Sequence, residues 1–76
     1  MRTFRIFKNE LNEPVRYTLI NSWDEVFSFD ANPSIGYNEF KGTFRRFKSK
    51  STKPFGTLIG FDELTPDAQE FVKDRI

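Results

Sequence analysis

The chain has 76 residues, a formal net charge of +1, and neither cysteine nor histidine. These counts exclude disulfides and zinc sites with Cys or His ligands, so a chain this short depends on its apolar core for stability. Ten Phe, two Tyr and one Trp supply that core, since each large ring buries about 150–250 Å². We predict one small domain that spans residues 1–76.

The sequence gives no sign of membrane insertion or secretion. No stretch approaches the ~18 consecutive apolar residues of a membrane span. The first ten residues, MRTFRIFKNE, lack the apolar run of a secretory signal. We therefore expect an intracellular, cytoplasmic protein without a membrane partner. The small net charge also argues against an acidic nucleic-acid mimic and a histone-like polycation.

The first two predicted strands form a hairpin. Residues 2–8, RTFRIFK, alternate in the manner of a strand, and the polar residues 9–14, NELNEP, provide the connection. Residues 15–20, VRYTLI, alternate again. This alternation places Val15, Tyr17 and Leu19 on one face and Arg16, Thr18 and Ile20 on the other.

The next segment predicts a helix. Ser22 and Glu25 have the spacing of a capping box, in which each side chain bonds the backbone N–H of the other residue. We therefore expect a helix over residues 22–29, with Asp24 and Glu25 in the first turn, where the helix dipole favours acids. Residues 30–37, DANPSIGY, are rich in turn formers and predict a loop.

A second hairpin is predicted from residue 38 onward. In the strand pattern of residues 38–48, Phe40, Gly42 and Phe44 share one face, and a bulge near Arg45–Arg46 would return Phe47 to the core side. Residues 49–54, SKSTKP, form a basic loop, and residues 55–61, FGTLIGF, form the partner strand. The rings expected in the core of this pair are Phe40, Phe44, Phe55 and Phe61.

The chain ends in a second predicted helix. Thr65 is a suitable N-cap, and Pro66 suits the first helical position. Ala68, Phe71 and Val72 belong to one apolar stripe. The resulting order, β-β-α-β-β-α, predicts an α+β fold: a four-stranded, mostly antiparallel sheet with two helices, the C-terminal one packed on the sheet.

The strongest functional signal is a basic, aromatic block from Phe40 to Phe61. It holds half of the twelve basic residues, five of the ten phenylalanines and no acidic residue. Basic side chains can follow a phosphate backbone, and exposed rings can stack on bases. The candidate binding residues are Lys41, Arg45, Arg46, Phe47, Lys48, Lys50 and Lys53. Alternatively, the rings are core residues and the cations are solvated or pair with acids of the last helix.

Two further segments are candidate interfaces. Trp23 lies beside two carboxylates and suits an interface anchor, since Trp is enriched at binding hot spots. Ile35 and Tyr37 lie in the predicted loop, where a binding surface is often presented. The alternatives are a capped helix whose Trp packs on the sheet, and a plain connection between helix and strand.

Nothing in the sequence favours catalysis. There is no His for general-base chemistry and no Cys nucleophile. The adjacent carboxylates Asp24-Glu25 and Asp62-Glu63 do not form an acid–base pair on a helix, because neighbouring helical residues point in different directions. We therefore predict a protein that is not an enzyme, with no catalytic residues, no metal and no cofactor.

Two functions remain open. The first is a small binding protein that docks on a macromolecular protein partner. Its size and composition resemble those of phage or mobile-element accessory proteins that inhibit or modulate host nucleic-acid enzymes of restriction or CRISPR type. The second is a nucleic-acid-binding module that uses the basic hairpin Lys41–Lys53. The oligomeric state is left open.

Overall fold

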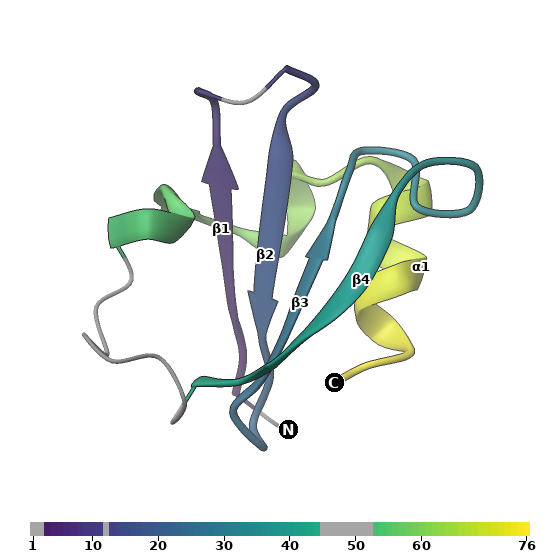
Figure 1. Cartoon of the computed structure of the whole chain (residues 1–76). Helices are drawn as coiled ribbons and strands as arrows, with labels where there is room; N and C mark the ends of the chain where they lie inside the picture. The colour runs from purple at the N-terminus through teal and green to yellow at the C-terminus, as the bar shows by residue number, and fades with distance from the viewer. Residues whose placement is uncertain (1–2, 12, 45–52) are drawn as a thin grey trace.

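One antiparallel sheet dominates the computed structural model, which describes residues 3–11, 13–44 and 53–76. Its strand order is β4-β3-β2-β1-β5 (Figure 1). The strands are β1 (Arg5–Asn9), β2 (Arg16–Ile20), β3 (Glu25–Phe29), β4 (Asn38–Thr43) and β5 (Thr57–Ile59). The other described elements are two 3-10 turns and one helix, namely η2 (Lys53–Phe55), η3 (Phe61–Glu63) and α1 (Pro66–Lys73).

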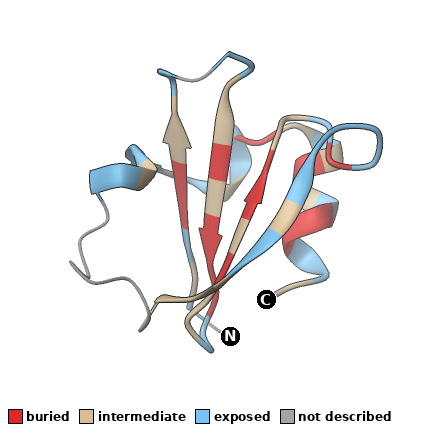
Figure 2. Cartoon of the chain, viewed as in Figure 1, coloured by how far each residue is buried: buried red, intermediate tan, exposed pale blue. Residues whose placement is uncertain are grey.

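The main core lies between the sheet and α1. Because side chains alternate between the two faces of a strand, one set of strand residues points toward the helix. The apolar residues of α1, which recur at helical spacing, pack against this set. Figure 2 shows the buried residues gathered along β1, β2 and β3 and on α1. The buried members are Ile6, Tyr17, Leu19, Phe29, Leu64, Ala68, Phe71 and Val72. The predicted packing of the C-terminal helix on the sheet is therefore confirmed.

A smaller cluster lies on the opposite face of the sheet, which we call the open face because α1 does not cover it (Figure 1). Phe7, Ile20 and Val26 are its buried members, and Phe44 and Phe55 pack against them. The Phe44 and Phe55 ring centroids lie 6.3 Å apart. Phe44 and Phe55, which lie on either side of residues 45–52 in the sequence, are therefore neighbours on this face.

The predicted sheet of four strands with two helices is wrong, because residues 25–29 form β3 and not a helix. β3 pairs with β2 on one side and with β4 on the other. Phe27 and Phe29 face α1, while Val26 belongs to the open-face cluster. A helix this short has little intrinsic stability, whereas the strand buries apolar side chains on both faces of the sheet.

Asn21 forms the turn that the capping-box interpretation assigned to Ser22. Its Oδ1 accepts from the backbone N–H groups of Trp23 at 3.0 Å and Glu25 at 2.9 Å. Its Nδ2 donates to Glu25 Oε1 and to the carbonyl of Arg75, both at 2.8 Å. Asp24 completes the turn with a φ of 61°, in the left-handed region that Asp and Asn tolerate. An Asx-type turn therefore joins β2 to β3.

A β-bulge in β4 changes the predicted faces of the second half. Phe40 pairs with Phe27 and Gly42 pairs with Val26, so Lys41 is the extra residue. Phe40 consequently packs on Phe27 on the helix side, while Phe44 joins the open-face cluster. The prediction that Phe40, Gly42 and Phe44 share one face is wrong. The bulge expected near Arg45–Arg46 lies outside the described residues, and the observed one precedes it.

The predicted pairing of the last two strands is also wrong, because β4 and β5 lie at opposite edges of the sheet. β5 pairs with β1. Phe55 belongs to η2 and packs on the open face, whereas Phe61 packs on the helix side. Gly56, with a φ of 101°, lies between η2 and β5 where the chain changes direction.

The start of α1 agrees with the prediction from Thr65 and Pro66. Thr65 Oγ1 accepts from the backbone N–H of Ala68, and Pro66 occupies the first turn. None of the helices in the part of the chain that the structure describes is long and apolar enough to span a membrane.

Candidate functional site

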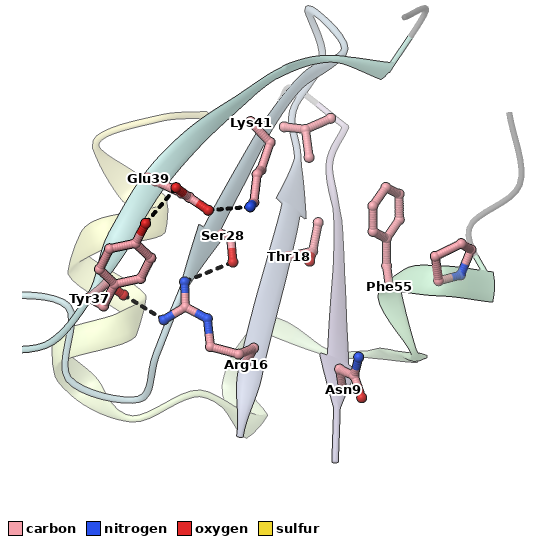
Figure 3. A pocket seen from close by; sticks show the side chains of 10 residues that line it. Asn9, Arg16, Thr18, Ser28, Tyr37, Glu39, Lys41 and Phe55 are labelled. Atoms are coloured by element: carbon pink, nitrogen blue, oxygen red, sulfur yellow. Dashed lines mark hydrogen bonds and ion pairs between the residues drawn. The ribbon is translucent and has the colours of Figure 1, made fainter. Parts of the chain in front are cut away.

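A trough of about 360 Å³ lies on the open face between β4 and η2 (Figure 3). Its floor comes from β2 and β3, and it includes the side chains of Thr18, Val26 and Ser28. Tyr37, Glu39 and Lys41 form the wall at β4, and Pro54 and Phe55 form the opposite wall. Arg16 and Asn9 lie at one end (Figure 3). The trough therefore combines a polar floor, a charged wall and an apolar wall.

Arg16 is held in a fixed orientation at the trough. Its Nη1 donates to the carbonyl of Tyr37 and its Nη2 donates to Ser28 Oγ, both at 2.8 Å. The guanidinium also lies over the Tyr37 ring, 4.9 Å from the centroid. Arginine has five N–H donors, so these two bonds orient the group and leave other donors for a ligand.

Glu39 links Tyr37, which directly precedes β4, to Lys41 within β4. Tyr37 Oη donates to Glu39 Oε2 at 2.6 Å, and Lys41 Nζ makes an ion pair with Glu39 Oε1. The Lys41 contact, followed by the Tyr37 bond, lowers the pKa of Glu39 below its ordinary value of 4.5. The bond to Glu39, followed by its negative charge, raises the pKa of Tyr37 above 10.0. At neutral pH Glu39 is therefore ionised and Tyr37 protonated.

The loop of residues 30–37 is fixed by side chains from within and from α1. The Asp30 carboxylate accepts from the backbone N–H groups of Asn32 at 2.9 Å and Tyr37 at 2.8 Å. Ser34 donates to Asp67 Oδ2 from its backbone at 3.1 Å and from its hydroxyl at 2.7 Å. These bonds set where Tyr37 meets Arg16, so the loop positions one side of the trough.

The same loop presents apolar side chains to solvent. Ile35 is 89% exposed and Tyr37 is 60% exposed. Pro33, in contrast, is buried. Because the loop is anchored on both sides of Ile35, this exposed residue sits on a pre-organised tip, which lowers the entropy cost of a contact made there.

The predicted site residues do not all come together. Lys41 lines the trough, and Lys53 is exposed at the start of η2, next to the trough residue Pro54. Trp23 lies in the β2–β3 turn, at the opposite end of β3 from the loop that carries Ile35 and Tyr37 (Figure 1). The other predicted binding residues, Arg45, Arg46, Phe47, Lys48 and Lys50, lie outside the described residues.

Sequence reasoning identified only Tyr37 and Lys41 among the residues that line the trough, and it missed the charged residues Arg16 and Glu39. The alternation of residues 15–20 placed Arg16 on the face away from Tyr17, which is the open face. The alternation identifies Arg16 as a surface residue of the open face only when it is known that α1 covers the face with Tyr17. Glu39 precedes the basic block by one residue, and its pairing with Lys41 follows from their positions along β4.

No comparison adds a relative to this geometry: neither the family models, nor the curated proteins, nor the solved structures that were searched contain a match to the chain. Among residues 3–11, 13–44 and 53–76, no three carboxylates converge in a way that would hold a metal ion. The trough and the loop beside it are therefore the candidate functional surface.

Proposed function

We propose that this chain is a binding protein without catalytic activity that docks on a protein partner through the 30–37 loop and the adjoining trough. The main support for this proposal is that the apolar side chain of Ile35 is 89% exposed on a loop that hydrogen bonds hold in place. Tyr37 and Arg16, residue types enriched at binding hot spots, lie next to it in the stacked pair already described. This surface supplies an apolar contact and polar contacts side by side.

The arrangement suits a protein partner because the loop is already ordered by bonds within the chain, so binding would cost little further conformational entropy. Asp30 and Asp67 bond the loop backbone whether or not a partner is present. An interface made by pre-organised aromatic and arginine side chains retains more of its contact energy as affinity. The size and composition of the sequence suggest a host enzyme of restriction or CRISPR type as the partner. Enzymes of this class are therefore the first candidates to test for binding.

The test places a photo-crosslinking residue at position 35 or at position 11. Leu11 is the matched control, since it is an apolar residue that is 96% exposed in the β1–β2 connection. We expect a partner to crosslink from position 35 and not from position 11. With that partner purified, Ile35→Asp should weaken binding by at least tenfold in calorimetry, while Leu11→Asp leaves the affinity unchanged. Equal losses from both variants would refute docking through the loop.

The alternative function, nucleic-acid binding, is favoured by one observation. Lys41 and Lys53, the first and last basic residues of the block, both lie at or next to the trough. If all six basic residues of the block neutralise phosphates on a single strand, log K should fall with log salt with a slope of about −4. A salt series with single-stranded and duplex oligonucleotides measures this slope. No binding at low salt would eliminate this alternative.

A further inference from the structure

The trough carries one uncompensated positive charge among its described lining residues. Two of them, Arg16 and Lys41, are cationic, and one, Glu39, is anionic, which leaves 2 − 1 = +1. Glu39 is already engaged by Lys41 and by Tyr37. Arg16 instead bonds two neutral oxygens and makes no ion pair with a described carboxylate, although its charge contributes weakly to lowering the pKa of Glu39. One singly charged anion would balance the trough.

The donors of the trough match a carboxylate. Arg16 has N–H groups beyond the two that bond Tyr37 and Ser28. Guanidinium groups bind planar carboxylates through parallel hydrogen bonds. The Thr18 hydroxyl, which lies on the trough floor, has no hydrogen-bond partner among the described residues and adds a neutral donor. Pro54 and Phe55, on the opposite wall, offer apolar surface to whatever follows the carboxylate.

We propose that the trough is a recognition site for an acidic side chain of the protein partner, presented on an extended segment with an apolar neighbour. This inference deepens the proposed docking function and rests on it for the nature of the partner. The carboxylate would bind Arg16, with Lys41 nearby, and the apolar neighbour would contact Pro54 and Phe55. A strand of nucleic acid fits less well, because it brings one charge per nucleotide, whereas the described lining residues have a net charge of only +1 and include Glu39.

The experiment is an NMR titration of the amide spectrum with three probes. They are a blocked peptide of alternating Glu and Leu residues, the matched peptide with Gln in place of Glu, and single-stranded oligothymidylate. We expect the Glu peptide to bind and to shift the amides of Thr18, Ser28 and Lys41. The Gln peptide should bind at least fivefold more weakly. Equal binding of the two peptides would overturn the proposal, and binding of oligothymidylate alone would replace it with nucleic-acid recognition.

Charge variants at positions outside the buried core sharpen the test, because none of them removes a core side chain. Lys41→Gln should weaken the Glu peptide about two- to fivefold, as expected for an exposed ion pair, and Glu39→Gln should strengthen it by a similar factor. The gain on removing Glu39 distinguishes recognition from a structural role, which would not raise affinity. Lys73→Gln is the matched control, since Lys73 makes a comparable exposed ion pair with Glu70 on α1. An equal loss from Lys73→Gln would show that only overall charge matters.

The carboxylate site and docking through the loop can be tested independently. Ile35 lies outside the trough lining, so Ile35→Asp should leave affinity for the short Glu peptide unchanged. If the peptide fails to bind while position 35 still crosslinks a partner, the carboxylate site is wrong and docking through the loop stands. If the peptide binds and no partner crosslinks at position 35, the loop proposal is wrong instead.

Discussion

Replacing Asn21 with Ala should be among the most damaging polar substitutions in the chain. Asn21 is 4% exposed and makes four hydrogen bonds, two within the β2–β3 turn, one to the Glu25 carboxylate and one to the carbonyl of Arg75. At about 0.5–1.5 kcal/mol net for each of the four bonds, their loss should cost about 2–6 kcal/mol. A chain of this length has a total stability of about 4–11 kcal/mol, so the variant should lose a large share of it.

Ser22→Ala is the matched control, because the two interpretations of this segment predict opposite rankings. If Ser22 capped a helix, its removal would cost about 1 kcal/mol, and Asn21 would matter little. In the observed turn Ser22 is exposed, and its side chain makes no hydrogen bond with another described residue, so the cost should lie within about 0.5 kcal/mol. Urea unfolding followed by circular dichroism measures both. A larger loss for Ser22→Ala than for Asn21→Ala would refute the turn.

Three further predictions follow from the fold and the site. Gly56→Ala should destabilise more than Gly42→Ala in urea unfolding. Both residues have positive φ, but a Cβ at Gly56 would overlap a backbone carbonyl of β1, whereas a Cβ at Gly42 would meet no described atom within 4 Å. Phe29→Ala should cost about 3–5 kcal/mol, because the ring is fully buried against Tyr17 and Phe71; Phe29→Leu, which fills more of the space, should cost less. In an absorbance titration the Tyr37 phenol should ionise above 10.0, and Glu39→Gln should lower its midpoint, because the pKa of Tyr37 is raised chiefly by Glu39.

The same pair predicts the sign of the pH dependence of stability. The pKa of Glu39 is lowered on folding, so its contribution is present above 4.5 and is lost as the pH falls through the folded value. The pKa of Tyr37 is raised on folding, so its contribution is present below 10.0 and is lost as the pH rises through the folded value. Comparing unfolding of Glu39→Gln with that of the parent chain from pH 3 to 11 checks both signs; an unchanged profile would contradict them.

The elements that could be predicted are those specified by local signals. Alternation over residues 2–8 and 15–20 located β1 and β2, and Thr65 with Pro66 located the start of α1. In each case the residues that carry the signal also make the contacts that stabilise the element. Neighbouring elements therefore did not need to be known.

The helix expected over residues 22–29 failed because its local signal was ambiguous. Ser22 and Glu25 have capping-box spacing, but Asn21 can close a turn with the same backbone segment. The choice between them is made by β2 and β4, which offer β3 partners on both sides. These pairings are distant in sequence, and a capping pattern carries no information about them.

The candidate site was predictable only in part for a related reason. Lys41 was identified from its charge and Tyr37 from its loop, because both features can be seen along the chain. Arg16 and Glu39 became site residues through register, since β2 and β4 lie on either side of β3. The bulge at Lys41 then decided which rings accompany them, by sending Phe44 to the open face.

The packing of the rings is the main structural argument between the two functions. Phe40 packs on Phe27 on the helix side, while Phe44 and Phe55 pack on the open-face cluster. Single-stranded nucleic acids are held largely by bases stacked on exposed aromatic faces, and these three rings already have protein neighbours. Phe40 is nonetheless 56% exposed, and Tyr37, at 60%, has Arg16 over its ring. Around the trough the described surface thus offers a guanidinium, hydroxyls and apolar edges more readily than a row of stacking platforms, and we therefore favour a protein segment with an acidic side chain as its ligand.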